Sequence, residues 1–153
     1  MPGERLFADT NLFLRYLTND VPAQADLVDR LLIQAAEGAI RLVTTPLVIA
    51  EIVWTLQSFY AVEPADIRSK VWAMLNTPGL EIVDGELVGS AVDTYADKNV
   101  DFIDAYNAEW MKQAGVETIC TFDRRHFARI DGITVANLAN LAAGDGSQST
   151  QPG

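Results

Sequence analysis

Short apolar runs alternate with longer segments of helical periodicity along most of this chain, and this alternation limits the folds it can adopt. It predicts strands at residues 5–8, 40–43, 80–83, 117–120 and 133–135, and helices at 11–17, 22–37, 46–60, 64–76, 86–96 and 101–113. Pro22, Pro46 and Pro64 stand at helix starts, and Gly38 and Gly115 stand at helix stops. Strands separated by helices predict right-handed crossovers and an α/β fold, in which helices cover both faces of a parallel sheet.

The length fits one domain followed by a short tail. A chain of 153 residues can bury roughly 68–70% of its unfolded surface, so its folding requires neither a disulfide nor a metal. We predict one domain over residues 1–140. From residue 141 onward Gly, Ser, Gln and Pro become frequent, and this composition predicts a disordered tail at 141–153.

Two single residues exclude several kinds of site. The chain has one cysteine, Cys120, and one histidine, His126, which excludes an internal disulfide and a zinc site built from Cys and His. The N-terminus shows no signal-peptide pattern, and no apolar stretch is long enough to span a bilayer. We therefore expect a cytoplasmic protein without a membrane partner.

Acidic residues follow the predicted strands. Asp9 comes directly after the first strand and Asp123 after the fourth; Asp101 and Asp104 begin the helix before that fourth strand. Glu51 lies in the first turns of the helix after the second strand. In an open α/β sheet, ligands bind beyond the carboxyl ends of the strands, so we expect these acids to converge there.

Each acid also has a structural interpretation. Asp9 suits the N-cap of the following helix, and Asp101 with Asp104 suits a cap and its first-turn partner. Glu51 fits a solvent-facing stripe, and Asp123 fits an ordinary turn. These interpretations stay open for each residue taken singly.

The acids are harder to explain as a group. Two carboxylates about 5 Å apart repel by roughly 3 kcal/mol at an effective dielectric constant near 20. Converging acids must therefore hold protons or a cation, and oxygen ligands select a hard ion, Mg²⁺ or Mn²⁺. Because Mg²⁺ is commonly bound together with substrate phosphates, the pattern indicates phosphoryl chemistry.

The net charge of −10, from 11 basic and 21 acidic residues, argues against non-specific adhesion to nucleic acid. It leaves a nucleic-acid substrate possible when metal ions supply positive charge. Arg124 and Arg125, in a cluster with His126 and Arg129, are possible contacts to phosphates, as is Arg15. A solvated loop explains the cluster equally well.

Four segments, in their order and spacing, resemble the PIN domain and in particular the VapC type of ribonuclease toxin. They are FADTNLFLRYLTND, TTPLVIAEIVWTL, DFIDAYNAEWMKQAG and ICTFDRRHFARI, and the resemblance extends from about residue 6 to 138. It implies a three-layer α/β/α fold with a five-stranded, mostly parallel sheet. It also implies an endoribonuclease that uses Mg²⁺ or Mn²⁺ to activate water, with products bearing 3′-hydroxyl and 5′-phosphate ends.

The resemblance assigns roles residue by residue. The family's four acids fall on Asp9, Glu51, Asp104 and Asp123. Of these, Asp9, Asp104 and Asp123 are the expected metal ligands. Supporting roles are implied for Asn11, Asp101 and Thr121. A homodimer and an antitoxin protein are the implied partners, and aromatic residues around Trp54 and Phe59 suit either the core or a groove for an antitoxin helix.

Two other functions are alternatives for a chain with these acids. An aspartate-nucleophile phosphatase would phosphorylate Asp9, but such enzymes usually carry a second acid two residues on, where this chain has Asn11. A non-catalytic Mg²⁺-binding receiver or adaptor module would respond to metal without cleaving RNA. The metal-dependent endoribonuclease is the leading hypothesis.

Overall fold

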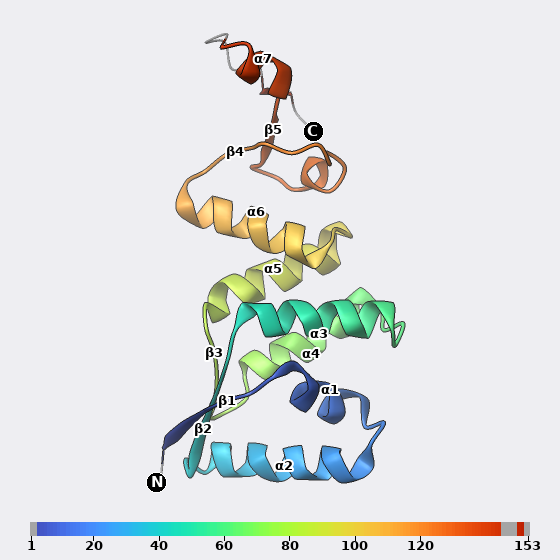
Figure 1. Cartoon of the computed structure of the whole chain (residues 1–153), viewed down its shortest axis with the longest axis vertical. Coiled ribbons are helices and arrows are strands. Elements are labelled where there is room, and N and C mark those ends of the chain that lie inside the picture. The colour runs from blue at the N-terminus through green and yellow to red at the C-terminus, as the bar shows by residue number, and fades with distance from the viewer. Residues whose placement is uncertain (1–2, 145–149, 152–153) are drawn as a thin grey trace. The chain divides into compact units, whose positions relative to one another are not determined.

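The structure is a computed structural model that describes residues 3–144 and 150–151 (Figure 1). Its backbone forms two compact units, of which the first ends at Gly89 and the second begins at Ser90. Each unit is described by itself. Helix α5 (Gly85–Lys98) begins in the first unit and ends in the second.

The first unit alternates strands and helices as its sequence predicts. Its elements are β1 (Glu4–Phe7), α1 (Thr10–Thr18), α2 (Pro22–Ala36), β2 (Ile40–Thr44), α3 (Pro46–Ser58), α4 (Pro64–Leu75) and β3 (Leu80–Ile82). Pro22, Pro46 and Pro64 each stand at a helix start, where the missing N–H breaks no helical hydrogen bond. Proline therefore sets the start of three helices.

The three strands form a parallel sheet with β2 in the centre. In this register Phe7 of β1 is opposite Val43 of β2, and Thr44 is opposite Ile82 of β3. The Thr44 hydroxyl, fully buried, donates to the Ala8 carbonyl at 2.8 Å, while the Thr44 carbonyl accepts from the Val83 N–H at 3.0 Å. Thr44 thus connects the carboxyl ends of all three strands.

Helices α1 and α2 pack against each other, α3 packs against α4, and α2 also contacts β2 and β3. The core of this unit is apolar; its most deeply buried side chains are Ile49, Ile52, Val53, Leu56, Ile67, Val71 and Val88. Removing such a side chain from water contributes about 1.5–3 kcal/mol. The apolar positions of α3 and α4 therefore hold these helices against the rest of the unit.

Gly79 permits a close contact between the turn before β3 and helix α2. A Cβ atom at this position would lie 2.2 Å from the carbonyl oxygen of Ala35, and the residue has a φ of +79°. Both the space and the backbone conformation require glycine here.

The second unit holds the end of α5 and α6 (Phe102–Ala114), β4 (Thr118–Ile119), the 3₁₀ turn η1 (Phe127–Arg129), β5 (Thr134–Ala136), α7 (Leu138–Ala142) and β6 (Thr150–Gln151). Strand β5 pairs in parallel with β4 and antiparallel with β6. Gly115, with a φ of +74°, caps the C-terminus of α6, and Val135 of β5 is fully buried.

The predicted α/β class with parallel strands is confirmed, and the strand count differs. Within residues 3–144 and 150–151 the chain forms six strands in two sheets of three, where the sequence predicts a single sheet of five. The sixth strand, β6, is supplied by the sequence after residue 140, and its pairing with β5 is antiparallel. Of the tail predicted at 141–153, residues 145–149 and 152–153 lie outside the described residues, α7 extends to Ala142, and β6 lies at Thr150–Gln151. In the described part of the chain, no helix is long and apolar enough to cross a membrane.

The connection between α1 and α2 is held by polar contacts around Asp20. The Tyr60 hydroxyl donates to Asp20 Oδ2 at 2.7 Å, the Thr18 hydroxyl donates to Asp20 Oδ1 at 2.9 Å, and the Arg15 guanidinium lies 3.6 Å away. The hydrogen bond from Tyr60, followed by that from Thr18, lowers the pKa of Asp20 below its ordinary value. The hydrogen bonds to the charged Asp20 carboxylate therefore stabilise the fold above the ordinary carboxyl pKa. This stabilisation is lost as the pH falls through the lowered pKa of Asp20.

Tyr60→Phe should raise the pKa of Asp20 toward that of a free aspartate, because it removes the strongest hydrogen bond to the charged carboxylate. The change can be followed by NMR titration of the carboxyl carbon of Asp20, with Tyr16→Phe on α1 as a control. An Asp20 pKa that is equal in the Tyr60 variant and the wild type would contradict this account.

Thr44→Val should lower the free energy of unfolding by about 1–3 kcal/mol, because it removes the donor to the Ala8 carbonyl without changing the volume of the side chain much. Thr44→Ser keeps the hydroxyl and should lose only the contribution of a methyl group, about 1 kcal/mol. Urea denaturation of the three proteins measures the difference. Equal stability of the Val variant and the wild type would show that the hydrogen bond does not hold the sheet together.

Candidate metal and nuclease site

Asp9 lies just beyond the carboxyl end of β1, where it is also the N-cap of α1. Its side chain accepts a hydrogen bond from the Thr10 N–H at 2.8 Å through Oδ1. Asp9 therefore caps α1, as its structural interpretation predicts. Because the cap uses one carboxylate oxygen, Oδ2 stays available for another partner.

Glu51 is connected to the same helix start through Thr10. The Thr10 hydroxyl, which is largely buried, donates to Glu51 Oε2 at 2.9 Å from the start of α1 to the second turn of α3. The exposed carboxylate of Glu51 is thus tethered rather than part of a free solvent stripe. In the first unit, the backbone and side chain of Thr10 bring Asp9 and Glu51 into one hydrogen-bonded chain.

In the second unit, Asp104 lies in the first turn of α6, and Asp123 lies in the turn that follows β4. The Thr121 hydroxyl accepts from the Asp123 N–H at 3.0 Å and donates to the Asp123 carbonyl at 3.2 Å. The Asp123 side chain in turn accepts from the Arg125 N–H at 3.3 Å. Local hydrogen bonds therefore set the direction of Asp123, and Thr121 has a defined part in them.

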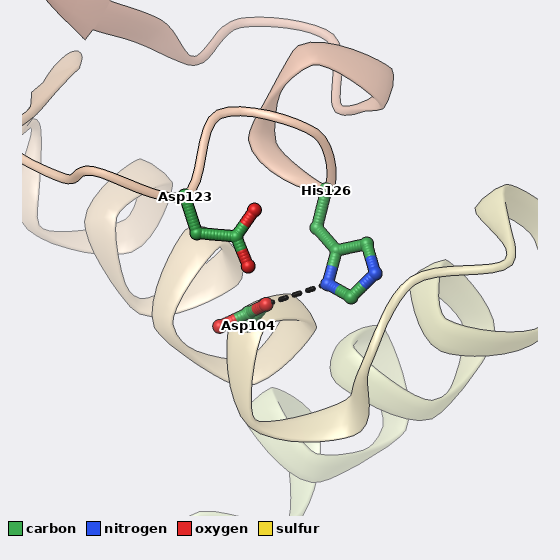
Figure 2. Close-up of side chains that lie close together, drawn as sticks. All are labelled: Asp104, Asp123 and His126. Atoms are coloured by element: carbon green, nitrogen blue, oxygen red, sulfur yellow. Dashed lines mark hydrogen bonds and ion pairs between the residues drawn. The ribbon is translucent and has the colours of Figure 1, made fainter.

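His126 completes this group. Its Nδ1–H donates to Asp104 Oδ2 at 2.7 Å, and both side chains are about three-quarters shielded, with 27% and 24% of their surface exposed. Figure 2 shows the carboxyl groups of Asp104 and Asp123 facing each other, with the imidazole beside Asp104. One ligand atom from each of the three residues lies within 4.8 Å of the other two.

This donor set fits a divalent cation. Two carboxylates at this distance repel each other, and a cation placed between them removes the repulsion. The hydrogen bond to His126 occupies Oδ2 of Asp104 and leaves its second oxygen for a metal. The carboxylate oxygens of Asp104 and Asp123 suit Mg²⁺ or Mn²⁺, and His126 holds one of these carboxylates in place.

The remaining predicted residues have separate positions. Asp101 is the N-cap residue of α6, but its side chain makes no capping hydrogen bond, and it does not belong to the group of three. Asn11 and Arg15 line a cavity between α1 and α2. Arg124 lines a smaller hollow of about 270 Å³ with Thr121 and Phe122, and Arg125 contributes its backbone N–H to Asp123.

Thr10 and His126 carry contacts that sequence reasoning did not assign. The sequence pattern assigns no role to Thr10, and it places His126 in a basic cluster that could face phosphates. A signal for each exists in the sequence: Thr10 follows a capping aspartate, and His126 is the only histidine, placed three residues after Asp123.

The chain matches the PIN domain family over residues 6–133 and belongs to it. PIN domains are in general metal-dependent nucleases that act on nucleic acid and typically bind divalent metals. This membership indicates a nuclease and does not favour the phosphatase or the receiver module. None of the curated proteins compared with the chain matches it.

His126→Ala should weaken the affinity of the protein for Mn²⁺ by about 10–100-fold, because residues that hold a metal-binding carboxylate in place typically contribute that much. His126→Asn can still donate to Asp104 from a nitrogen close to the position of Nδ1, and should retain part of the affinity. Titration calorimetry with Mn²⁺ measures the difference. Asp131→Asn is the control, because this carboxylate is 95% exposed and pairs with Lys98. Equal affinity of the Ala variant and the wild type would contradict the assignment.

Proposed function

We propose that this protein is an endoribonuclease that depends on Mg²⁺ or Mn²⁺ and acts as the toxin of a toxin–antitoxin pair, of the VapC type. The observation that supports it most directly is the group formed by Asp104, Asp123 and His126 within a PIN domain. A divalent cation is the ligand that this group of donors suits, and a nuclease is the function typical of the family.

In this proposal Asp9, Glu51, Asp104 and Asp123 are the catalytic residues. Asp9, Asp104 and Asp123 are metal ligands, and Glu51 assists them. Two features of the units support the assignment: Asp9 and Asp123 both follow the carboxyl ends of parallel strands, and Asp9 and Asp104 lie at the starts of helices. The carboxyl ends of strands are where ligands bind in α/β proteins.

The residues of the chain have separate tasks in the reaction. His126 fixes the carboxylate of Asp104, the Thr10 hydroxyl fixes Glu51, and the Arg125 N–H fixes one oxygen of Asp123. Ligands held in this way need no reorganisation when the substrate arrives. A bound divalent cation supplies Lewis acidity toward the scissile phosphate and the attacking water. Arg124 and Arg125, which follow Asp123, contact the backbone of the RNA.

The proposed partners are an antitoxin protein and a second copy of the chain, and the proposed compartment is the cytoplasm. Exposed apolar side chains on and beside α3 support a protein partner: Leu47 is 82% exposed, Trp54 65% and Phe59 77%. Exposed apolar patches commonly mark an interaction surface, and Leu47 and Trp54, seven residues apart, share one face of α3. Trp54 and Phe59 are thus not core residues, although the core was one of the two interpretations of their sequence.

Asp104→Asn should reduce the rate of RNA cleavage by about 100-fold or more, because the loss of a ligand removes several kcal/mol of transition-state stabilisation. Purified wild type and variant are incubated with a panel of structured RNAs and Mg²⁺, Mn²⁺ or EDTA, and cleavage is followed by gel electrophoresis. Asp131→Asn, the same substitution at an exposed site of the second unit, should cleave like the wild type.

Cleavage that survives in the Asp104 variant, or in EDTA, would contradict the proposed centre. The toxin role has its own test in bacterial cells. Expression of the wild type should arrest growth, and expression of the Asp104 variant at the same level should not. Equal growth with both proteins would contradict the toxin role while leaving the nuclease activity to the test in vitro.

A further inference from the structure

The turn that follows His126 is attached to the second unit by an arginine outside the group of three metal-binding candidates. Arg129 is the last residue of η1, and its Nη1 donates to the carbonyl oxygen of Asn99 at 2.6 Å. The two residues are 30 positions apart in the sequence. The sequence places Arg129 in a basic cluster that could contact phosphates, whereas in the structure this nitrogen is hydrogen-bonded to the backbone of the protein itself.

The acceptor of this hydrogen bond stands at the end of a helix. Asn99 directly follows the last residue of α5, and its φ of +52° lies in the left-handed region, which asparagine enters more readily than most residues. Carbonyl groups at the C-terminus of a helix lack partners within the helix and carry partial negative charge. A guanidinium that donates to a carbonyl at this place therefore makes a favourable charged hydrogen bond.

The geometry of η1 places Arg129 on the same side of the turn as His126. A 3₁₀ turn has about 3 residues per turn, so side chains three positions apart are eclipsed. His126 is the N-cap of η1, and its carbonyl accepts from the Arg129 N–H at 3.1 Å. The two side chains therefore leave the turn in the same direction.

Both side chains bind the segment around the start of α6. His126 donates to Asp104 in the first turn of this helix (Figure 2), and Arg129 donates to Asn99 in the connection that precedes it. Two hydrogen bonds from one short turn thus hold the connection and the helix start together. If the bond to Asn99 is missing, the turn can pivot about the bond that remains.

Apolar packing alone does not set the orientation of η1. Phe127 and Ile130 are each only 4% exposed, and they bury one side of the turn. Burial of apolar surface has no preferred direction, whereas a hydrogen bond constrains both distance and angle. Lys98 Nζ also lies 3.6 Å from Asp131 Oδ2, but both side chains are exposed, and such an ion pair contributes little. Arg129 therefore supplies a directional contact that the packing does not.

We infer that Arg129 is a positioning residue of the metal group: its hydrogen bond to Asn99 holds η1 in the orientation in which the His126 imidazole reaches Asp104. The inference rests on the proposed function for the metal, and it adds a residue that acts on the site through another side chain. Loss of this contact should weaken metal binding although every ligand is still present.

The alternative role for Arg129, a contact to an RNA phosphate, predicts a different effect on Mn²⁺ binding without RNA. Removal of a positive charge near a cation site reduces the repulsion of the cation. A residue that only contacts phosphate should therefore leave the Mn²⁺ affinity unchanged or slightly higher when it is neutralised. Loss of a positioning contact should lower the affinity, so the sign of the change separates the two roles.

The test is the Mn²⁺ affinity of the full chain, measured by titration calorimetry without RNA. Arg129→Met removes the donor and keeps an aliphatic stem. It should weaken binding about fivefold or more, since contacts that hold a ligand in place contribute about 10–100-fold and this one acts through one more residue. Arg129→Lys keeps a donor and should bind within about twofold of the wild type. Lys98→Met, which removes a neighbouring charge of the same sign, is the control and should also stay within about twofold.

A double-mutant cycle tests whether Arg129 acts through His126. In a protein that carries His126→Ala, the further change Arg129→Met should alter the Mn²⁺ affinity by less than about twofold, because the imidazole that it positions is gone. All proteins are compared well below the thermal midpoint of the least stable one, so that each is folded. Arg129→Gln, whose amide ends two bonds short of the position of Nη1, is a second variant without the contact.

Unchanged or higher Mn²⁺ affinity in the Met and Gln variants would overturn the inference, and the phosphate contact would then be the better role. Equal weakening by Met and Lys, or effects of Arg129 and His126 that simply multiply, would overturn it as well. A wild type that binds no Mn²⁺ would overturn it together with the metal site. A wild type that binds Mn²⁺ but cleaves no RNA contradicts only the nuclease and leaves the role of Arg129 standing.

Discussion

The hydrogen bond from the buried Thr44 hydroxyl to the Ala8 carbonyl is the contact on which the first unit depends. It fixes the end of β1 against the end of β2, and Asp9 is the next residue after Ala8. Two further hydrogen bonds follow along the chain: Asp9 caps α1, and the Thr10 hydroxyl donates to Glu51 on α3. The positions of two proposed catalytic carboxylates therefore follow from the pairing of two strands that are separated by a helical hairpin.

Most of the secondary structure could be predicted from the sequence, because prolines at helix starts and glycines after helix ends act locally. What could not be predicted depends on pairing between distant segments. The fourth strand was expected at 117–120, but only Thr118 and Ile119 pair with β5. Helix α7, for which the sequence predicts no element, begins at Leu138, and strand β6 lies within the Gly- and Ser-rich segment. Threonine is a residue type favoured at N-caps, yet Thr45 occupies the N-cap of α3 without a capping hydrogen bond, so the residue type alone does not fix the side chain.

In the candidate site, too, local features could be predicted from the sequence and contacts between distant residues could not. A position after a parallel strand predicts where a carboxylate is placed, and in the structure Asp9 follows β1 and Asp123 follows β4 as the sequence predicts. A side-chain hydrogen bond between residues 22 positions apart, such as that of His126 with Asp104, depends on how a turn closes over a helix. The structural and functional interpretations of Asp9 also proved compatible, because a carboxylate has two oxygens and the cap uses only one.

His126 is the only histidine in the chain, and it lies in the group that we propose holds the metal. Its imidazole ring therefore gives the single set of histidine proton resonances in the spectrum of the unlabelled protein. Paramagnetic Mn²⁺ bound beside the ring would broaden that set selectively, so the native residue is a built-in spectroscopic probe. The histidines of a polyhistidine tag would overlap with this signal and compete for the cation. The tag should therefore be removed before any metal is added.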